Sequence, residues 1–243
     1  MISRVAVVPQ PPLLVPELVG GPDEDAERLR AACRDAAAAL LASSDHWVAV
    51  GAHTRPAHHP PATTGTFAPY GADVPVSLQR VNPAQDRRPP AADLPLPVLV
   101  AGWLRGQVDA ADVPVHLVAQ DATPADCARD GARLAAELSG PDPVALLVVG
   151  DGSHRHGEHA VGRPDERAPA FDDAVARALA TADLAALAGL DPAVAADLGA
   201  AGRAPWQVLA AALRADGRTW RGTRSTALVP FGVAYHVAVW DPA

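Results

Sequence analysis

A short apolar run and a proline-rich segment meet near the start of the chain, in Val5-Ala6-Val7-Val8-Pro9-Gln10-Pro11-Pro12-Leu13-Leu14-Val15-Pro16. The four apolar residues at its start predict a buried strand. The prolines that follow fix φ and remove backbone donors, so the loop after this strand is held extended and rigid. Rigid loops at strand ends commonly carry binding sites, and Gln10 is the polar side chain of this loop. We therefore expect Gln10 to contact a substrate.

Further apolar runs, rich in Val, predict strands at residues 47–50, 96–101, 113–119, 144–149 and 235–240. Helical patterns lie between several of these runs, at residues 23–41, 124–138 and 168–180. Strands that alternate with helices indicate an α/β fold, with a mostly parallel or mixed central sheet flanked by helices on both faces. A chain of 243 residues, 49% of them hydrophobic, is long and apolar enough to bury such a sheet. We expect a single domain over residues 1–243.

Two segments depart from this alternation. Residues 56–97 contain many Pro, Gly and Thr, which predicts excursion loops and edge strands, with a weak strand at residues 74–78. Residues 183–205 are rich in Ala and contain Asp191-Pro192, which predicts two short helices that meet at a turn. Neither segment has the composition of a linker between domains.

The composition argues against several classes of function. The net charge of −8, without any basic run, argues against binding to nucleic acid or to an anionic membrane surface. All 20 basic residues are Arg, which excludes a Schiff-base lysine. Cys33 and Cys127 lack a metal-binding spacing and fit a reduced, cytoplasmic setting. The chain starts on a strand, and no apolar run approaches the roughly 18 to 20 residues that span a bilayer, so we expect a soluble protein without a leader.

A polar, glycine-rich loop follows the strand at residues 144–149, with the sequence Gly150-Asp151-Gly152-Ser153-His154-Arg155-His156-Gly157-Glu158-His159. Open α/β sheets bind ligands at the carboxyl ends of their strands, which makes this loop a candidate site. Asp151 lies between two glycines inside the expected pocket, where we expect it to take part in catalysis; its alternative role is to cap the next element. We also expect Ser153 of this loop to contact a substrate. The histidines of the loop could equally belong to a solvated surface.

Two other segments offer residues of the right chemistry. His53 follows the strand at residues 47–50, and a neutral imidazole is a suitable ligand for Fe(II) or Zn. One imidazole does not complete a site, and His58 and His59 could either add to it or point into solvent. Arg203 could fix the carboxylate of an anionic ligand bidentately, or it could be an exposed arginine at the end of a helix.

These segments together resemble the LigB-type class III extradiol dioxygenase family, in order and over most of the chain. The resemblance rests on Pro9-Gln10-Pro11-Pro12-Leu13-Leu14, His53, Gly150-Asp151-Gly152-Ser153, Gly202-Arg203-Ala204-Pro205 and the closing strand at residues 235–240. It implies an α/β domain that cleaves catechol-type aromatic rings oxidatively with a catalytic non-haem iron. It also implies that His53 binds the iron and that His154, beside Ser153, moves a proton from and to the catechol as an acid and base.

The chain departs from the family at two metal ligands. The family has a His at the position of Gln10, which offers only an amide oxygen. The carboxylate or thiolate expected late in the chain has no equivalent around residues 199–206. Our first hypothesis is therefore an extradiol-dioxygenase-like oxidoreductase that binds a small molecule beside Gln10, His53 and residues 151–154, with a divalent metal if the donors converge.

Two alternatives follow from the same residues. The first is a metal-free descendant that keeps the pocket to bind a small molecule or to recruit a partner. The second is a zinc ion held by His53 and other loop histidines, for hydrolytic or structural work. We also expect a homodimer, because two-fold symmetric assemblies are the commonest kind.

Overall fold

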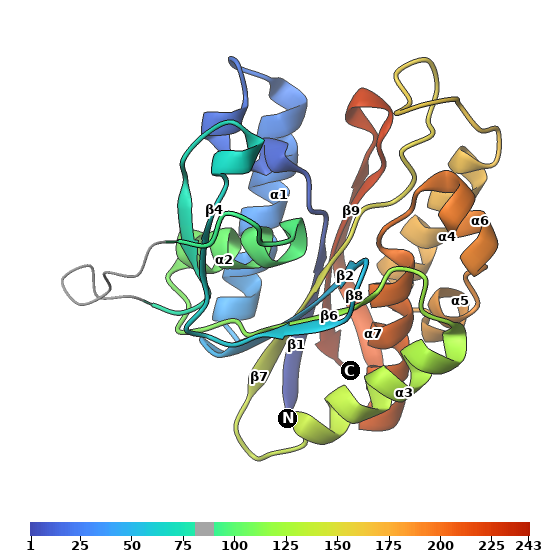
Figure 1. Ribbon diagram of the computed structural model, residues 1–243. Coiled ribbons are helices and arrows are strands. Elements are labelled where there is room, and N and C mark those ends of the chain that lie inside the picture. Colours follow the sequence, from blue (N-terminus) through green and yellow to red (C-terminus); the bar gives the residue numbers. More distant parts are fainter. Residues whose placement is uncertain (81–89) are drawn as a thin grey trace.

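A mixed sheet of seven strands runs through the middle of the computed structural model, which describes residues 1–80 and 90–243 (Figure 1). The strand order is β3-β6-β2-β7-β1-β9-β8. The bounds are β1 (Ile2–Val8), β2 (Trp47–His53), β3 (Ala57–His59), β6 (Val115–Ala119), β7 (Val144–Val149), β8 (Trp220–Leu228) and β9 (Tyr235–Pro242). Four neighbours, β6, β2, β7 and β1, are parallel, whereas β3, β8 and β9 pair antiparallel. A separate two-stranded sheet joins β4 (Thr64–Thr66) to β5 (Pro75–Ser77).

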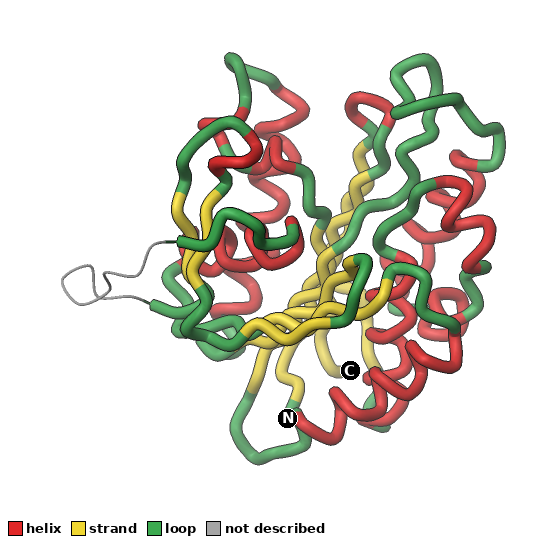
Figure 2. The backbone as a smooth tube through the Cα atoms, viewed as in Figure 1, coloured by secondary structure: helices red, strands yellow, loops and turns green. Residues whose placement is uncertain are grey.

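Helices cover both faces of the sheet, which confirms the predicted α/β fold (Figure 2). On one face lie α1 (Glu24–Leu41) and α2 (Leu96–Val108), and on the other lie α3 (Pro124–Glu137), α4 (Ala168–Thr181), α5 (Leu184–Ala188), α6 (Pro192–Leu198) and α7 (Arg203–Asp216). The side chains of alternate residues in β1 point to opposite faces of the sheet. Ala6 and Val8 pack with α1 and α2, while Val5 and Val7 pack in the core that contains α3, α4 and α7. Residues 5–8 of the strand are therefore all apolar, as a doubly covered sheet requires, whereas Ser3 and Arg4 near its start are only partly buried.

Side chains at the helix starts explain why several helices begin where they do. The Asp23 carboxylate accepts a hydrogen bond from the Ala26 N–H and caps α1. Thr123 and Asp126 form a capping box at the start of α3. Asp183 and Asp191 cap α5 and α6, the two short helices predicted from the sequence. No helix within residues 1–80 and 90–243 combines the length and apolar character needed to cross a bilayer.

The prediction of a strand at residues 96–101 is wrong, because this run begins helix α2. Pro97 stands in the first turn, where the missing N–H of proline is tolerated. Residues 97–105 are all buried, so this helix shows no polar face that would distinguish it from a buried strand. The weak strand at residues 74–78 is confirmed as β5, and β8 was not predicted because most of its side chains are exposed.

Candidate functional site

The parallel strands end at one edge of the sheet, and a polar residue stands at or just after each end. These residues are Gln10 after β1, His53 at the end of β2, Gln120 after β6 and Asp151 after β7. Two hydrogen bonds join them in pairs: the Gln120 N–H donates to the His53 carbonyl at 2.9 Å, and the Gln10 N–H donates to the Asp151 side chain, at Oδ1, at 2.7 Å. The carboxyl edge therefore brings Gln10 and Asp151 together, as the sequence predicted for a site at strand ends.

The loop that carries Gln10 is tied to helix α1 by hydrogen bonds. It forms two short 3-10 turns, Pro12–Leu14 and Pro16–Leu18. Arg30 of α1, itself buried, donates from Nε to the Leu14 carbonyl at 2.8 Å and from Nη2 to the Leu13 carbonyl at 3.1 Å. The side chain of Gln10 is partly buried, and its Oε1 has no hydrogen-bond partner in the part of the chain that the structure describes. A buried acceptor of this kind is suited to a donor from a ligand or water.

Asp151 is the strongest candidate for chemistry at this edge. Burial raises the pKa of its carboxyl to about 7, although the hydrogen bond from the Gln10 N–H favours the charged form. Burial, and to a smaller extent the nearby Asp151, also raises the pKa of the Tyr235 hydroxyl and of the Cys33 thiol. Asp151 therefore titrates near neutral pH, which is the range in which a carboxyl group can accept or donate a proton.

His53, the predicted metal ligand, is exposed at the end of β2. His58 and His59 lie on β3, where the His58 ring packs 4.7 Å from the ring of His116 and the pKa of His59 is lowered first by burial and then by His58 and His53. No group of three or more His, Cys, Asp or Glu side chains that could hold a metal occurs among residues 1–80 and 90–243. With Gln10 in place of the first His and no ligand-type side chain near residues 199–202, the donor set does not fit the iron site implied by the resemblance, and it does not fit a zinc site either.

Ser153 and His154 are placed differently from one another. Ser153 is fully buried; its hydroxyl donates to the Leu198 carbonyl at 3.1 Å and accepts from the Arg155 N–H at 3.1 Å. This prediction of a substrate contact is therefore wrong, because the hydroxyl is used inside the protein. His154 is partly buried, and burial and Arg155 lower its pKa. Its ring lies against Gly199, where an added Cβ would come within 1.8 Å of Nε2.

A buried carboxylate between two histidines was missed by the sequence reasoning. His156 Nε2 lies 2.7 Å from Asp172 Oδ2, and His236 Nε2 lies 2.9 Å from Asp172 Oδ1. The Ser153 N–H also donates to both oxygens, at 3.2 Å each. Asp172 is only 4% exposed, so this cluster ties the polar loop after β7 to α4 and β9. Its signal in the sequence was the position of Asp172 on the apolar stripe of α4, one turn before Val175.

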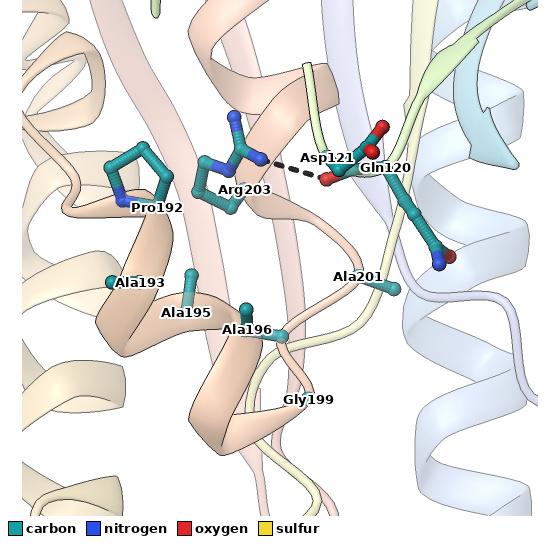
Figure 3. A pocket seen from close by; sticks show the side chains of 10 residues that line it. Gln120, Asp121, Pro192, Ala193, Ala195, Ala196, Gly199, Ala201 and Arg203 are labelled. Carbon is teal, nitrogen blue, oxygen red and sulfur yellow. Dashed lines mark hydrogen bonds between the residues drawn. The ribbon is translucent and has the colours of Figure 1, made fainter. Parts of the chain in front are cut away.

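A cavity of about 440 Å³ opens beside the carboxyl end of β6 (Figure 3). It is lined by Gln120, Asp121, Pro192, Ala193, Ala195, Ala196, Gly199, Ala200, Ala201 and Arg203. Arg203 begins α7 but is only 3% exposed, so the alternative of an exposed helix-end arginine is wrong. The loop of residues 199–203 joins this cavity to the rest of the edge, because the Gly202 N–H donates to the Asp151 carbonyl at 2.8 Å.

The comparisons with known proteins give little further information. No protein-family model matches the chain, and no curated protein matches it. Among solved structures, it is similar to the crystal structure of uncharacterized protein JW3007 from Escherichia coli K12, with 13% sequence identity and a TM-score of 0.48. That match covers 98% of this chain and 99% of the other. None of these comparisons assigns the chain to a family, so its function has to be argued from the carboxyl edge itself.

Proposed function

We propose that this protein binds a small organic molecule without a metal ion, at the carboxyl edge of the sheet around Asp151. The observation that carries the proposal is the Asp151 carboxyl itself, partly buried at the end of a central strand, with a pKa of about 7. Its hydrogen bond from the Gln10 N–H holds it against the rigid proline loop. A side chain with a strongly shifted pKa at the carboxyl end of a buried strand is typical of ligand sites in open α/β sheets.

The polar groups of the site indicate what the ligand carries. Asp151 accepts hydrogen bonds when ionised, and Gln10 Oε1 is an acceptor without a partner within the described ranges. Acceptors on these two residues, which a hydrogen bond joins at the same edge of the sheet, favour a ligand that presents hydroxyl or amine donors. Such a ligand also favours the ionised form of Asp151, so its binding lowers the pKa of this carboxyl and releases protons at neutral pH.

The metal-free alternative is the better supported of the hypotheses drawn from the sequence. Iron-dependent ring cleavage needs a set of protein ligands with open positions for substrate and oxygen. His53 is exposed, Gln10 offers one amide oxygen, and residues 199–202 offer only backbone and methyl groups. We therefore derive no oxidative step for this chain, and the resemblance contributes only the expectation of a pocket at this edge.

The test combines metal content with ligand binding. The protein is expressed anaerobically with iron and zinc supplied, and bound metal is measured by elemental analysis for wild type and His53→Ala. A panel of hydroxyl- and amine-bearing fragments, each with its methylated counterpart, is then titrated in the presence of EDTA and followed by NMR. The same titrations are run on Asp151→Asn, with Asp173→Asn on the exposed face of α4 as the matched control.

We expect substoichiometric metal in both proteins, and donor-bearing fragments that bind wild type and Asp173→Asn about tenfold more tightly than Asp151→Asn. Near-stoichiometric metal that is lost in His53→Ala would overturn the proposal in favour of a metal enzyme. Fragment binding that does not distinguish Asp151→Asn from wild type would refute the role given to Asp151.

A further inference from the structure

Arg203 is a buried cation for which residues 1–80 and 90–243 supply no carboxylate partner. Within residues 1–80 and 90–243 its guanidinium forms no ion pair, and its hydrogen bonds go to uncharged groups. Nη2 donates to the Gln120 carbonyl at 2.7 Å, and Nη1 donates to the Ala122 carbonyl and, at 3.1 Å, to Gln207 Oε1. Cys127 Sγ lies 3.9 Å from Nη1. Burial of a charge with neutral partners alone leaves much of its desolvation uncompensated.

The position of Arg203 in the fold adds to this imbalance. It is the first residue of α7, a helix of 14 residues whose start has no side-chain cap. The start of a helix carries partial positive charge, which favours an anion and disfavours a cation. Asp121 borders the same cavity but is exposed, so water screens its charge. The described residues thus place a buried guanidinium in the wall of the cavity, at the end of a helix where a positive charge is disfavoured.

A comparison with the other buried arginines separates a structural role from a ligand role. Arg30 is also almost fully buried, and it pairs with Glu27. Arg105 is 7% exposed and donates to the carbonyls of Ser77 and Ala110, but it does not line the cavity. Among the described residues Arg203 has no anionic partner, and it also lies in the cavity wall. Its Nε–H makes no hydrogen bond in the described part of the chain, so one edge of its planar fork is available to a ligand.

The rest of the cavity wall suits an apolar body. Opposite Arg203 lie the small side chains of α6 and of the loop after it, among them Ala193, Ala196 and Ala201 (Figure 3). A volume of about 440 Å³ is in the range of small-molecule sites. In such sites a small number of polar groups orients the ligand within a mostly apolar wall, and here the buried polar group is the guanidinium of Arg203.

We infer that this cavity binds a small organic carboxylate, whose carboxylate group accepts hydrogen bonds from Arg203 and whose apolar part packs on the alanine wall. An arginine fork matches the geometry of a carboxylate, and the start of α7 adds to the attraction. The inference deepens the proposed function, because it specifies a negative charge on the ligand. It rests on the proposed function in treating the cavity and the surroundings of Asp151 as one site.

The test uses matched probes: benzoate and phenylacetate against benzamide and phenylacetamide, which have nearly the same shape but no charge. Binding is measured by NMR titration at constant ionic strength. Ala196→Leu narrows the cavity without changing the core, because Ala196 is exposed on α6. Ala132→Leu, on an exposed position of α3, makes the same change away from the cavity. Arg203→Lys keeps the charge but removes the planar fork, and its fold is checked by circular dichroism.

We expect the carboxylates to bind wild type and Ala132→Leu at least about tenfold more tightly than the amides do. The affinity of the carboxylates should fall by about tenfold or more in Ala196→Leu and in Arg203→Lys. Equal binding of acids and amides, or carboxylate binding that Ala196→Leu leaves unchanged, overturns the inference. Asp151→Asn distinguishes the two proposals. If carboxylates still bind Asp151→Asn and the donor-bearing fragments bind it as tightly as wild type, the carboxylate site is supported and the proposed function is refuted. If the donor-bearing fragments bind Asp151→Asn more weakly but wild type does not prefer carboxylates to amides, only the carboxylate site is refuted.

Discussion

Replacing Asp151 by Asn should change how the stability of the protein depends on pH. The pKa of Asp151 is about 7 in the folded protein, against about 3.9 in an unfolded chain. Because the folded value is the higher one, the folded state binds more protons than the unfolded state between about pH 4 and pH 7. The wild type therefore loses free energy of unfolding as the pH rises through this window, and the loss levels off above about pH 7. The full difference corresponds to about 4 kcal/mol.

Asn keeps the acceptor for the Gln10 N–H but does not titrate, so Asp151→Asn should lack this loss. The free energy of unfolding of the variant minus that of wild type should rise by about 1.2 kcal/mol per pH unit between about pH 5 and 6.5, and by about 2 to 3 kcal/mol between pH 5 and 8. Urea unfolding at constant ionic strength measures it, with Asp173→Asn as the exposed control. Parallel pH profiles of wild type and Asp151→Asn would refute the assignment of a raised pKa to this carboxyl.

Two further substitutions test the surroundings of the site. Asp172→Asn places an amide where two imidazole donors converge, so one donor from His156 or His236 loses its acceptor. The free energy of unfolding, measured with urea, should fall by about 3 kcal/mol, and a fall of under about 0.5 kcal/mol would contradict the buried cluster. Gly199→Ala places a Cβ against the His154 ring at a residue with φ 66°; it should shift the His154 ring resonances in NMR spectra and destabilise the fold by about 1 to 3 kcal/mol, whereas unchanged resonances would show that the ring lies elsewhere.

Most of the sheet could be predicted because buried parallel strands have a simple pattern. The runs at residues 5–8, 47–50, 144–149 and 235–240 all lie within strands, since both of their faces are covered and, apart from His236, their positions are apolar. The same rule misled at residues 96–101, where a helix buried on every side gives the same pattern. Periodicity alone cannot separate these cases, and Pro97 in the first turn was the one local sign of a helix.

The strand-end positions of the polar residues were predictable, but their contacts were not. Asp151 and Gln10 were expected at strand ends, and local sequence was enough to place them there. The contacts of Asp172 with His156 and His236 join residues 16 and 64 positions apart, which no local pattern encodes. Arg203 was expected near a pocket, but its burial follows from the packing of α7 against the loop that contains Gln120 and Ala122.

The order of strands has a consequence for the synthesis of this protein. β1 is made first, yet one of its two neighbours is β9, the strand made last, with Val5 opposite Trp240 and Val7 opposite Ala238. Among the described strands, β9 is the one neighbour of β8. A chain still on the ribosome therefore carries an open edge on β1 and an unpaired β8 until residues 235–242 emerge. Such edges pair readily with other chains, so chaperones that shield nascent strands should matter for the yield of this protein more than for folds whose sheet closes earlier.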